Sequence, residues 1–359
     1  MTAPCRILVS GWVGADNAGD ELIFRSLATK LAERGAAVTT MSTRPDATRR
    51  AHGVDAIGWS DVAGTVRAIR STDALIVGPG GILQDETSIW NLPAHLHRAL
   101  AARATRTPIL GLGLGAGPLD TASGRILVRS ALRSVPLTVR DDDSARLLSE
   151  VGLRNVTVTA DLAYGLPVPT ADAAEQIVAC LRPFSGSGGL IPARRSDLRT
   201  LEGDERVAAA AAGLDELSRR SSLPIHLLAF EAERDDRYHG LIAERMTQPV
   251  TTGVATVDTA FDEVARSRLV VGMRYHAVVA AVMAGRPAVV IGYSPKVRSL
   301  AHRLGDAGLL VDNDPASYRH VAEGVDLLGR DDSVLGIRVE RRAAEAGNDS
   351  ALDRFLSSL

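Results

Sequence analysis

The first half of the chain alternates short apolar runs with longer segments in which apolar residues recur every three or four positions. The first apolar run, residues 6–10, leads into a glycine-rich turn over residues 11–19, and residues 20–34 follow with helical spacing. A short apolar run beside turn residues indicates a strand, and the longer spacing indicates a helix. This region therefore predicts a strand, a turn and a helix in succession.

The same alternation continues through the first half. Further apolar runs predict strands at residues 37–41, 74–77, 109–114, 137–139 and 156–159. Helical patterns lie between most of them, at residues 59–70, 91–106, 124–134 and 143–151. Strands that alternate with helices favour a parallel sheet that carries helices on both faces.

A proline-containing stretch over residues 166–170 is followed by a second series of the same kind. It predicts strands at residues 176–181, 225–230, 269–272 and 288–291, and helices at residues 204–219, 236–245 and 276–284. The last residues form an amphipathic helical pattern. We expect an α/β fold of two facing Rossmann-like domains, residues 1–168 and 169–336, with a C-terminal helix, residues 337–359, that could pack back on the first domain.

Composition narrows the classes of function. A length of 359 residues suits two domains. A net charge of −2 leaves no basic field for a nucleic-acid backbone. Cys5 and Cys180 are too few and too far apart for a disulfide framework or a thiolate zinc site, and the histidines form no metal-binding pair, so we expect no metal and no cofactor. The chain start lacks signal-peptide features and no apolar run reaches the ~20 residues that span a bilayer, which predicts a cytoplasmic protein.

Lysine is rare in this chain. Among 41 basic residues only Lys30 and Lys296 are lysines. A bias towards arginine codons explains the rarity, and it leaves Lys30 without a particular role.

The first two of three glycine clusters, all at predicted strand ends, contain polar residues. The first cluster holds Asp16, Asn17 and Asp20. Glycines allow close backbone approach, and the crevice at the strand ends is where such sheets bind ligands. Because two carboxylates would repel a pyrophosphate, sugar hydroxyls fit better. The alternative is that Asp20 only caps the helix and the glycines only form the turn.

The second cluster, residues 78–81, includes Gly80 and Gly81 and is followed by Gln84 and Thr87. Residues 111–117 repeat the glycine pattern on another predicted strand. Tight packing alone can demand glycine, but three clusters at strand ends of one domain favour a ligand-binding face.

Cationic residues gather at two strand ends of the second half. Arg274 and His276 follow one predicted strand, and Lys296 follows the next. If these strands are neighbours, the three side chains emerge at one edge and form an anion site with an acid or base beside it. The alternatives are a capping or core role for His276 and a solvated loop lysine at 296.

Four further charged residues lie at predicted strand ends. Arg182 could point into the cleft. Arg140 precedes three aspartates, so it fits either an ion pair at a helix start or a ligand contact. Glu231 and Asp235 are either acidic groups at the cleft or loop charges.

Taken in order along the chain, these motifs resemble the polysaccharide pyruvyl transferase family. The matching segments are residues 11–20 with the Asn-Ala-Gly-Asp-Glu continuation, 78–88, 113–118, Val-Arg-Asp at 139–141, Thr-Ala-Asp at 159–161, Leu-Arg-Pro at 181–183, Gly-Met-Arg-Tyr-His at 272–276 and Tyr-Ser-Pro-Lys at 293–296. The family often has leucine where this chain has Tyr275.

The resemblance implies a fold, a reaction and a set of roles. The fold would be similar to that of two-domain GT-B glycosyltransferases. The reaction would move pyruvate from phosphoenolpyruvate, as a ketal, to a sugar of a cell-surface glycan or its lipid-linked precursor. His276 would be the acid or base, with Arg140, Arg274 and Lys296 also catalytic. Phosphoenolpyruvate would be bound by Arg182, Arg274 and Lys296, and the acceptor by Asp16, Asn17, Asp20, Gly80, Gly81, Gln84 and Thr87.

Two other functions remain open at this point. One is a nucleotide-sugar glycosyltransferase on the same scaffold, because a fold does not fix a function. The other is a non-catalytic glycan-binding protein. A lipid-linked acceptor would bring the protein to the inner face of the cell membrane, and the sequence leaves homo-oligomerisation open.

Overall fold

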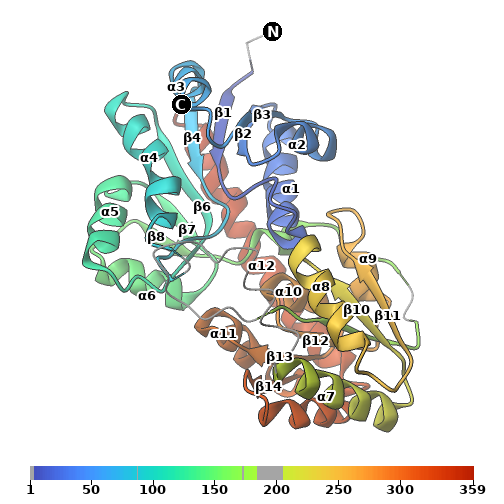
Figure 1. The fold of residues 1–359 in the computed structure, drawn as a ribbon. Helices are drawn as coiled ribbons and strands as arrows, with labels where there is room; N and C mark the ends of the chain where they lie inside the picture. The colour runs from blue at the N-terminus through green and yellow to red at the C-terminus, as the bar shows by residue number, and fades with distance from the viewer. Residues whose placement is uncertain (1–3, 87, 172–173, 184–204) are drawn as a thin grey trace.

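The computed structural model describes residues 4–86, 88–171, 174–183 and 205–359 (Figure 1). Two α/β domains follow one another along the chain, each built on its own parallel sheet. Most of the apolar runs seen in the sequence form buried strands, β8 at the sheet edge being partly exposed, and the segments between the runs form helices. This confirms the predicted α/β class.

The first domain carries an eight-stranded sheet. Its strands are β1 (Arg6–Ser10), β2 (Ala37–Ser42), β3 (Asp55–Gly58), β4 (Ala74–Val77), β5 (Gly80–Leu83), β6 (Ile109–Ala116), β7 (Leu137–Val139) and β8 (Val156–Val158). Its helices are α1 (Ala18–Glu33), α2 (Pro45–His52), α3 (Val62–Ser71), α4 (Asn91–Ala104), α5 (Ala122–Leu132) and α6 (Asp142–Glu150), and the 3-10 helix η1 (Leu162–Gly165) ends the series.

The strand order of this sheet decides which loops meet. The order is β3-β2-β1-β4-β6-β7-β8, with β5 paired to β6. From β1 the chain builds outwards through β2 and β3, then returns to add β4 on the other side of β1. The loops after β1 and β4 therefore leave the sheet on opposite sides of this reversal, which is where such sheets form a crevice. Those loops carry the first two glycine clusters.

The second domain repeats this plan with six strands. They are β9 (Ile177–Cys180), β10 (Ile225–Ala229), β11 (Val250–Val254), β12 (Leu269–Gly272), β13 (Ala288–Gly292) and β14 (Gly308–Asp312). Helices α7 (Glu205–Ser221), α8 (Ala232–Ala243), α9 (Ala260–Ala265), α10 (Tyr275–Ala284), α11 (Pro295–Arg303) and α12 (Asp331–Leu356) accompany them, with the 3-10 helices η3 (Gly305–Ala307) and η4 (Ser317–Leu327).

The second sheet also reverses direction at a pair of central strands. Its order is β11-β10-β9-β12-β13-β14, so the reversal lies between β9 and β12. Arg182 follows β9, Arg274 follows β12 and Lys296 follows β13. Since all three strands are parallel neighbours, their following residues emerge at the same edge of the sheet.

The two domains are joined by backbone contacts and by a shared core. The amide of Ala18 donates to the carbonyl of Phe230 at 2.8 Å, and the amide of Ala232 donates to the carbonyl of Asp16 at 3.2 Å. These bonds join the start of α1 to the loop after β10. Apolar residues of α1, η1 and α10 belong to one continuous buried core, and α10 is buried almost throughout.

Helix α12 runs from the second domain to the first, where the C-terminus lies (Figure 1). Near its start, Arg338 donates to the carbonyl of Met283 in α10 at 2.9 Å. Further along, buried Asn348 accepts hydrogen bonds from the hydroxyls of Thr138 and Thr159, at 2.7 and 2.9 Å. The helix therefore contacts both domains.

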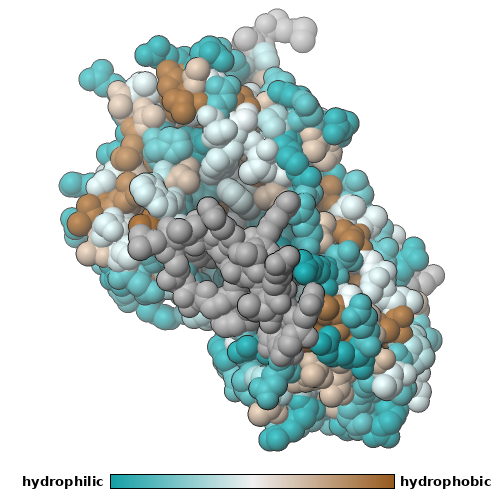
Figure 2. Space-filling view, in the orientation of Figure 1, coloured by the Kyte–Doolittle hydropathy of each residue, from teal (hydrophilic) through white to brown (hydrophobic). Residues whose placement is uncertain are grey.

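Hydrophilic residues cover most of the face shown in Figure 2, and hydrophobic residues are scattered among them. The larger exposed apolar side chains include Trp12 and Trp90 in the first domain. Across the described part of the chain, no helix combines the length and the apolar character needed to cross a membrane.

Candidate functional site

The central feature of the cleft is a histidine held by a buried aspartate. His276 lies in the first turn of α10, directly after the strand β12, and Asp161 lies just before η1 in the other domain. Nε2 of His276 is 3.4 Å from Oδ2 of Asp161, and Arg140 donates to the same oxygen at 3.2 Å. One carboxylate oxygen therefore connects an imidazole to a guanidinium.

The carboxyl group of Asp161 stays ionised despite its burial. Burial alone would raise its pKa, but the charge and hydrogen bond of His276 and the charge of Arg140 outweigh that effect and lower the pKa to about 2. A fixed negative charge beside His276 sets the orientation of the ring. The sequence showed Asp161 within a family motif, but gave it no place in the site.

Gly19 allows the first domain to approach this histidine. A Cβ atom at position 19 would lie 2.3 Å from Nδ1 of His276, which no side chain could tolerate. Asn17 caps α1 by accepting a hydrogen bond from the amide of Gly19 at 3.0 Å. The helix cap is therefore Asn17 and not Asp20, and Asp20 is left free of that role.

Arg140 and Lys296 share a glycine surface. A Cβ atom on Gly81 would lie 3.6 Å from one terminal nitrogen of Arg140 and 3.9 Å from Nζ of Lys296. The guanidinium of Arg140 lies 3.9 Å from the ring centroid of Tyr275, a cation–π contact. Within the described residues, no carboxylate lies close enough to Lys296 to form an ion pair. Gly81 thus leaves space beside two cations that come from different domains.

Arg274 is already paired with carboxylates. Its Nε donates to Asp235 at 2.9 Å, and one terminal nitrogen donates to Glu231 at 2.6 Å and also to Asp235. These contacts give Glu231 and Asp235 a definite place: they hold the guanidinium at the end of β12. Both acids therefore belong to an ion-pair cluster with Arg274.

Arg182 pairs with an aromatic residue instead. It donates to the hydroxyl of Tyr293 at 3.1 Å, and its guanidinium lies 4.8 Å from the centroid of that ring. Burial would raise the pKa of Tyr293, but the positive charges of Lys296, Arg182 and Arg274 lower it. Arg182 therefore lies against Tyr293, and the charges of Lys296 and Arg274 also act on this hydroxyl.

Asp20 is the acidic group that faces these cations. A Cβ atom on Gly80 would lie 3.9 Å from its Oδ1. Burial raises the pKa of Asp20 to about 6, and the charges of His276 and Lys296 only partly oppose this effect. A carboxyl group that exchanges its proton near neutral pH therefore lies between the glycine clusters and the cations.

The other residues predicted to bind an acceptor differ in their surroundings. Asp16 has a positive φ of 56° and forms an ion pair with Arg44. Gln84 is half-buried and already makes a polar contact. Thr87 lies outside the described residues. Asp85, between them, accepts from the amides of Asp120 and Thr121 at 2.8 and 2.9 Å, which is a structural role.

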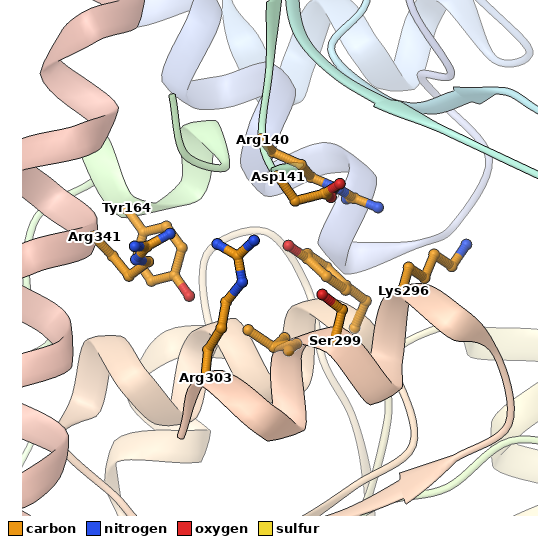
Figure 3. A pocket seen from close by; sticks show the side chains of 9 residues that line it. Arg140, Asp141, Tyr164, Lys296, Ser299, Arg303 and Arg341 are labelled. Carbon is orange, nitrogen blue, oxygen red and sulfur yellow. The ribbon is translucent and has the colours of Figure 1, made fainter. Parts of the chain in front are cut away.

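A small pocket of about 10 Å³, with room for about one water molecule, opens beside Arg140 and Lys296 (Figure 3). Residues from both domains line it: Arg140, Asp141, Tyr164, Tyr275, Lys296, Ser299, Leu300, Arg303 and Arg341. In Figure 3 Arg140 and Lys296 direct their charged ends to one side, while Arg303 reaches towards Tyr164. No three potential metal-binding side chains come together among the residues that the structure describes.

Comparisons with known proteins identify a family and a shared fold. The sequence model of the polysaccharide pyruvyl transferase family matches residues 17–295. No curated protein sequence matches the chain. The UDP-GlcNAc 2-epimerase of Neisseria meningitidis, bound to UDP-GlcNAc, has a similar structure, with a TM-score of 0.62 and 9% identity over 99% of this chain and 100% of its own.

Two further solved structures are similar over almost the whole chain. The S. aureus MnaA–UDP co-structure has a TM-score of 0.64 and 11% identity, covering 99% of this chain and 95% of its own. MurG of Acinetobacter baumannii has a TM-score of 0.55 and 13% identity, covering 98% and 100%. At such identities the likeness concerns the fold alone. It confirms two facing Rossmann-like domains in a GT-B-like arrangement.

Proposed function

The chain belongs to the polysaccharide pyruvyl transferase family, and we propose that phosphoenolpyruvate is its donor and that its product is a pyruvate ketal on a glycan. The acceptor sugar belongs to a cell-surface glycan or to its lipid-linked precursor. Phosphate is the second product.

The reaction balances with one acid–base group and no redox step. A proton adds to the methylene carbon of phosphoenolpyruvate, which leaves an oxocarbenium-like centre at the neighbouring carbon. One sugar hydroxyl attacks that centre and loses its proton; the carbon–oxygen bond to phosphate then breaks, and a second hydroxyl attacks. Of the two hydroxyl protons, one restores the acid and the other leaves with the phosphate.

His276 is the proposed acid and base. Its Nε2 faces Asp161, so Nδ1, on the side of Gly19, is the nitrogen that exchanges a proton with the reactants. A positioned general acid or base contributes about 10² to 10⁴ in rate. Asp161 acts as a positioning residue because its carboxylate, 3.4 Å from Nε2, fixes the orientation of the ring.

Arg140, Lys296 and Arg182 supply the positive charge for the donor. Phosphoenolpyruvate carries a carboxylate and a phosphate, and fixed cations stabilise the charge that develops on the departing phosphate. The first two cations have Gly81 between them, and Arg182 lies beside Tyr293. Arg274, already paired with Glu231 and Asp235, contributes by fixing the end of β12.

The acceptor would enter from the glycine clusters of the first domain. Gly80 and Gly81 leave backbone surface open, and Asp20 offers a carboxyl group that can accept a hydrogen bond from a sugar hydroxyl. Asp16, Asn17, Gln84 and Thr87 lie in the same two loops of the sequence. This side of the cleft therefore suits a neutral, hydroxyl-rich ligand.

The observation that carries the proposal is the meeting of Arg140 and Lys296 over Gly81, with His276 held by Asp161 nearby. Thermal unfolding in the presence of phosphoenolpyruvate tests it. We expect phosphoenolpyruvate to raise the Tm of the wild-type protein and to have little effect on Lys296→Gln. Stabilisation by a uridine diphosphate sugar, and none by phosphoenolpyruvate, would instead support a glycosyltransferase.

A further inference from the structure

The segment that contains α4 and α5 carries positive charge without the acidic residues that accompany it elsewhere in the chain. Residues 88–133 contain six arginines and one acidic residue, Asp120. The whole chain has 43 acidic residues in 359, so an average stretch of 46 residues would hold five or six. The segment therefore has a net charge of +5, six minus one, in a chain whose net charge is −2.

Most of these arginines lie on one surface. Helices α4 and α5 pack against each other over the same buried core, and Arg103 of α4 donates to the carbonyl of Arg133, directly after α5, at 2.6 Å. Arg98 is buried. The five exposed members are Arg103, Arg106, Arg125, Arg129 and Arg133. Both helices lie on the side of the first domain that faces away from the second domain (Figure 1). This surface, formed by the exposed residues of 89–133, is termed the basic flank.

The exposed arginines are not neutralised within the protein. None of the five forms an ion pair with a carboxylate of the described residues. The helix dipole favours positive charge in a last turn, which suits Arg103 and Arg129. Arg125 is in the first turn of α5, the unfavourable end, and donates only to the carbonyl of Leu119 at 2.8 Å. Helix stability alone therefore does not explain the charge of this surface.

Exposed apolar side chains lie among these charges. Four of the eleven large apolar side chains that are exposed among the described residues belong to the basic flank: Ile89, Trp90, Leu100 and Ile126. Trp90 is 64% exposed and Ile126 is 66% exposed. Tryptophan favours the boundary between water and lipid, where its ring is in an apolar layer and its N–H stays hydrated. A surface that combines arginines with exposed apolar groups is typical of proteins that bind a bilayer surface.

We propose that the basic flank binds the surface of a lipid bilayer that contains anionic lipids. The guanidinium groups pair with lipid phosphates, for which their fork of donors is suited, and Trp90 and Ile89 enter the headgroup region. A soluble polyanion would use the charges but would gain nothing from the exposed apolar side chains. The combination therefore favours a bilayer.

The starts of the two helices link this surface to the cleft. Asn91, the first residue of α4, donates to the carbonyls of Ile82 and Gln84 at 2.9 and 2.8 Å, so α4 begins at the carboxyl end of β5. Asp85 accepts from the amide of Thr121, just before α5, which holds the start of α5 at the same edge. Trp90 therefore lies at the edge of the sheet that carries the glycine clusters. In one respect the inference rests on the proposed function: a lipid-linked acceptor would reach the cleft while still anchored in the bilayer.

Sedimentation of the full chain with lipid vesicles tests the proposal. We expect binding to vesicles of equal parts phosphatidylcholine and phosphatidylglycerol to be about tenfold tighter, or more, than to phosphatidylcholine alone, and to weaken as salt is added. The double variant Arg129→Gln/Arg133→Gln should bind about 25-fold more weakly, because each arginine near an anionic surface contributes about fivefold. Neither side chain makes a polar contact with a described residue, so the fold should be unchanged.

The matched control is Arg50→Gln/Arg266→Gln. It removes two exposed arginines, one from α2 and one after α9, and changes the net charge by the same amount. We expect this control to bind vesicles like the wild type. Equal weakening in the two double variants, or no binding of the wild type to the anionic vesicles, would overturn the proposal.

Tryptophan fluorescence separates a bilayer from a soluble polyanion. Vesicles with brominated acyl chains should quench the fluorescence of the bound wild type, and should quench Trp90→Phe less, because Trp90 is the most exposed tryptophan of the described residues. Inorganic polyphosphate serves as the soluble polyanion. Binding of polyphosphate as tight as that of vesicles, without quenching by the brominated lipid, would show a polyanion site and would overturn bilayer binding.

Failure of this inference and failure of the proposed function give different results. A water-soluble nitrophenyl glycoside needs no bilayer, so Arg129→Gln/Arg133→Gln should pyruvylate it at the wild-type rate. Normal turnover in a protein that binds no vesicles would refute the docking surface and leave pyruvyl transfer in place. Vesicle binding that the double variant weakens, in a protein that does not bind phosphoenolpyruvate, would support the surface and refute the donor.

Discussion

The two lysines of this arginine-rich chain occupy different environments. Lys296 lies beside Gly81 and Arg140 without a carboxylate partner among the described residues, whereas Lys30 is buried between Glu345 and Asp349. Lys30 was expected to have no particular role, and this expectation is wrong. A compact ammonium is useful in both places, because a guanidinium needs more space and fixed directions for its hydrogen bonds.

Lys296→Arg should impair catalysis although it keeps the charge. The longer, planar group would compete with Arg140 for the space over Gly81. We expect kcat/KM for phosphoenolpyruvate to fall about tenfold or more, roughly the effect of one charge-assisted hydrogen bond. Phosphate release under initial-rate conditions measures this. Wild-type activity in the variant would return Lys296 to the role of a solvated loop lysine.

Asp161→Asn should lower activity and change the acid stability of the protein. The activity loss should reach about 10²-fold, because His276 loses the charge that orients it. The pKa of Asp161 is lowered to about 2 in the folded protein from a usual value near 3.8. Its charge therefore stabilises the fold above about pH 4, and this contribution disappears as the pH falls through 2.

Unfolding of wild type and Asp161→Asn should be followed across that pH range. The stability difference between them should shrink steadily from pH 4 towards pH 2. A difference that stays constant over this range would contradict the ionised, paired state of Asp161.

Asp20→Asn should have the opposite pH signature. The pKa of Asp20 is raised to about 6 by burial, so its ionisation destabilises the fold as the pH rises from about 4 to 6. The variant cannot ionise at position 20 and so avoids this destabilisation. It should be more stable than the wild type at neutral pH, but not near pH 4. Denaturant unfolding at the two pH values checks this, and an advantage that is equal at both would contradict it.

At the scale of elements, α12 joins the two domains through ion pairs. Lys30 and Arg34 of the first domain form ion pairs with Glu345, Asp349 and Asp353 of this helix, at distances from 2.6 to 3.2 Å. Glu345 and Lys30 are both nearly buried. The sequence showed the amphipathic pattern of the last residues, but the helix begins earlier, at Asp331.

Lys30→Met should destabilise the protein by about 3 kcal/mol, because removing one partner leaves buried negative charge uncompensated. Arg146→Ala is a matched control: it breaks a 3.0 Å pair with Asp143 in which both side chains are more than half exposed. The free energy of unfolding of this control should fall by less than about 1 kcal/mol. Urea unfolding measures the free energy of unfolding of both variants. A loss in Lys30→Met as small as that in Arg146→Ala would show that the Lys30 cluster contributes no more than a surface ion pair.

The strands that the sequence pattern missed lie mostly at the edges of the sheets. The strands β3, β11 and β14 each pair on one side only and are partly exposed, and β3 and β11 lack a continuous apolar run. Central strands such as β4, β9 and β12 are buried throughout and were predicted correctly. Hydrophobic patterning reports burial, and it therefore identifies the centre of a parallel sheet better than its edges.

At the scale of the molecule, the sequence placed the glycine clusters and the cations at strand ends but could not show which ends meet. That depends on strand order, which sets β1 beside β4 and β9 beside β12. Ion-pair partners were equally hidden: nothing in the local pattern around Arg274 indicates that Asp235, from the first turn of α8, neutralises it. The link from Asp161 to His276 crosses between domains for the same reason.

The most direct test of the account is a reaction of the pure protein with phosphoenolpyruvate and a set of nitrophenyl or lipid-linked glycosides. We expect phosphate release that depends on the acceptor, in equal amount to pyruvate ketal formed on the sugar. His276→Ala should retain binding of phosphoenolpyruvate and lose most of the rate. No phosphate release with any acceptor, together with no binding of phosphoenolpyruvate, would contradict the proposed pyruvyl transfer.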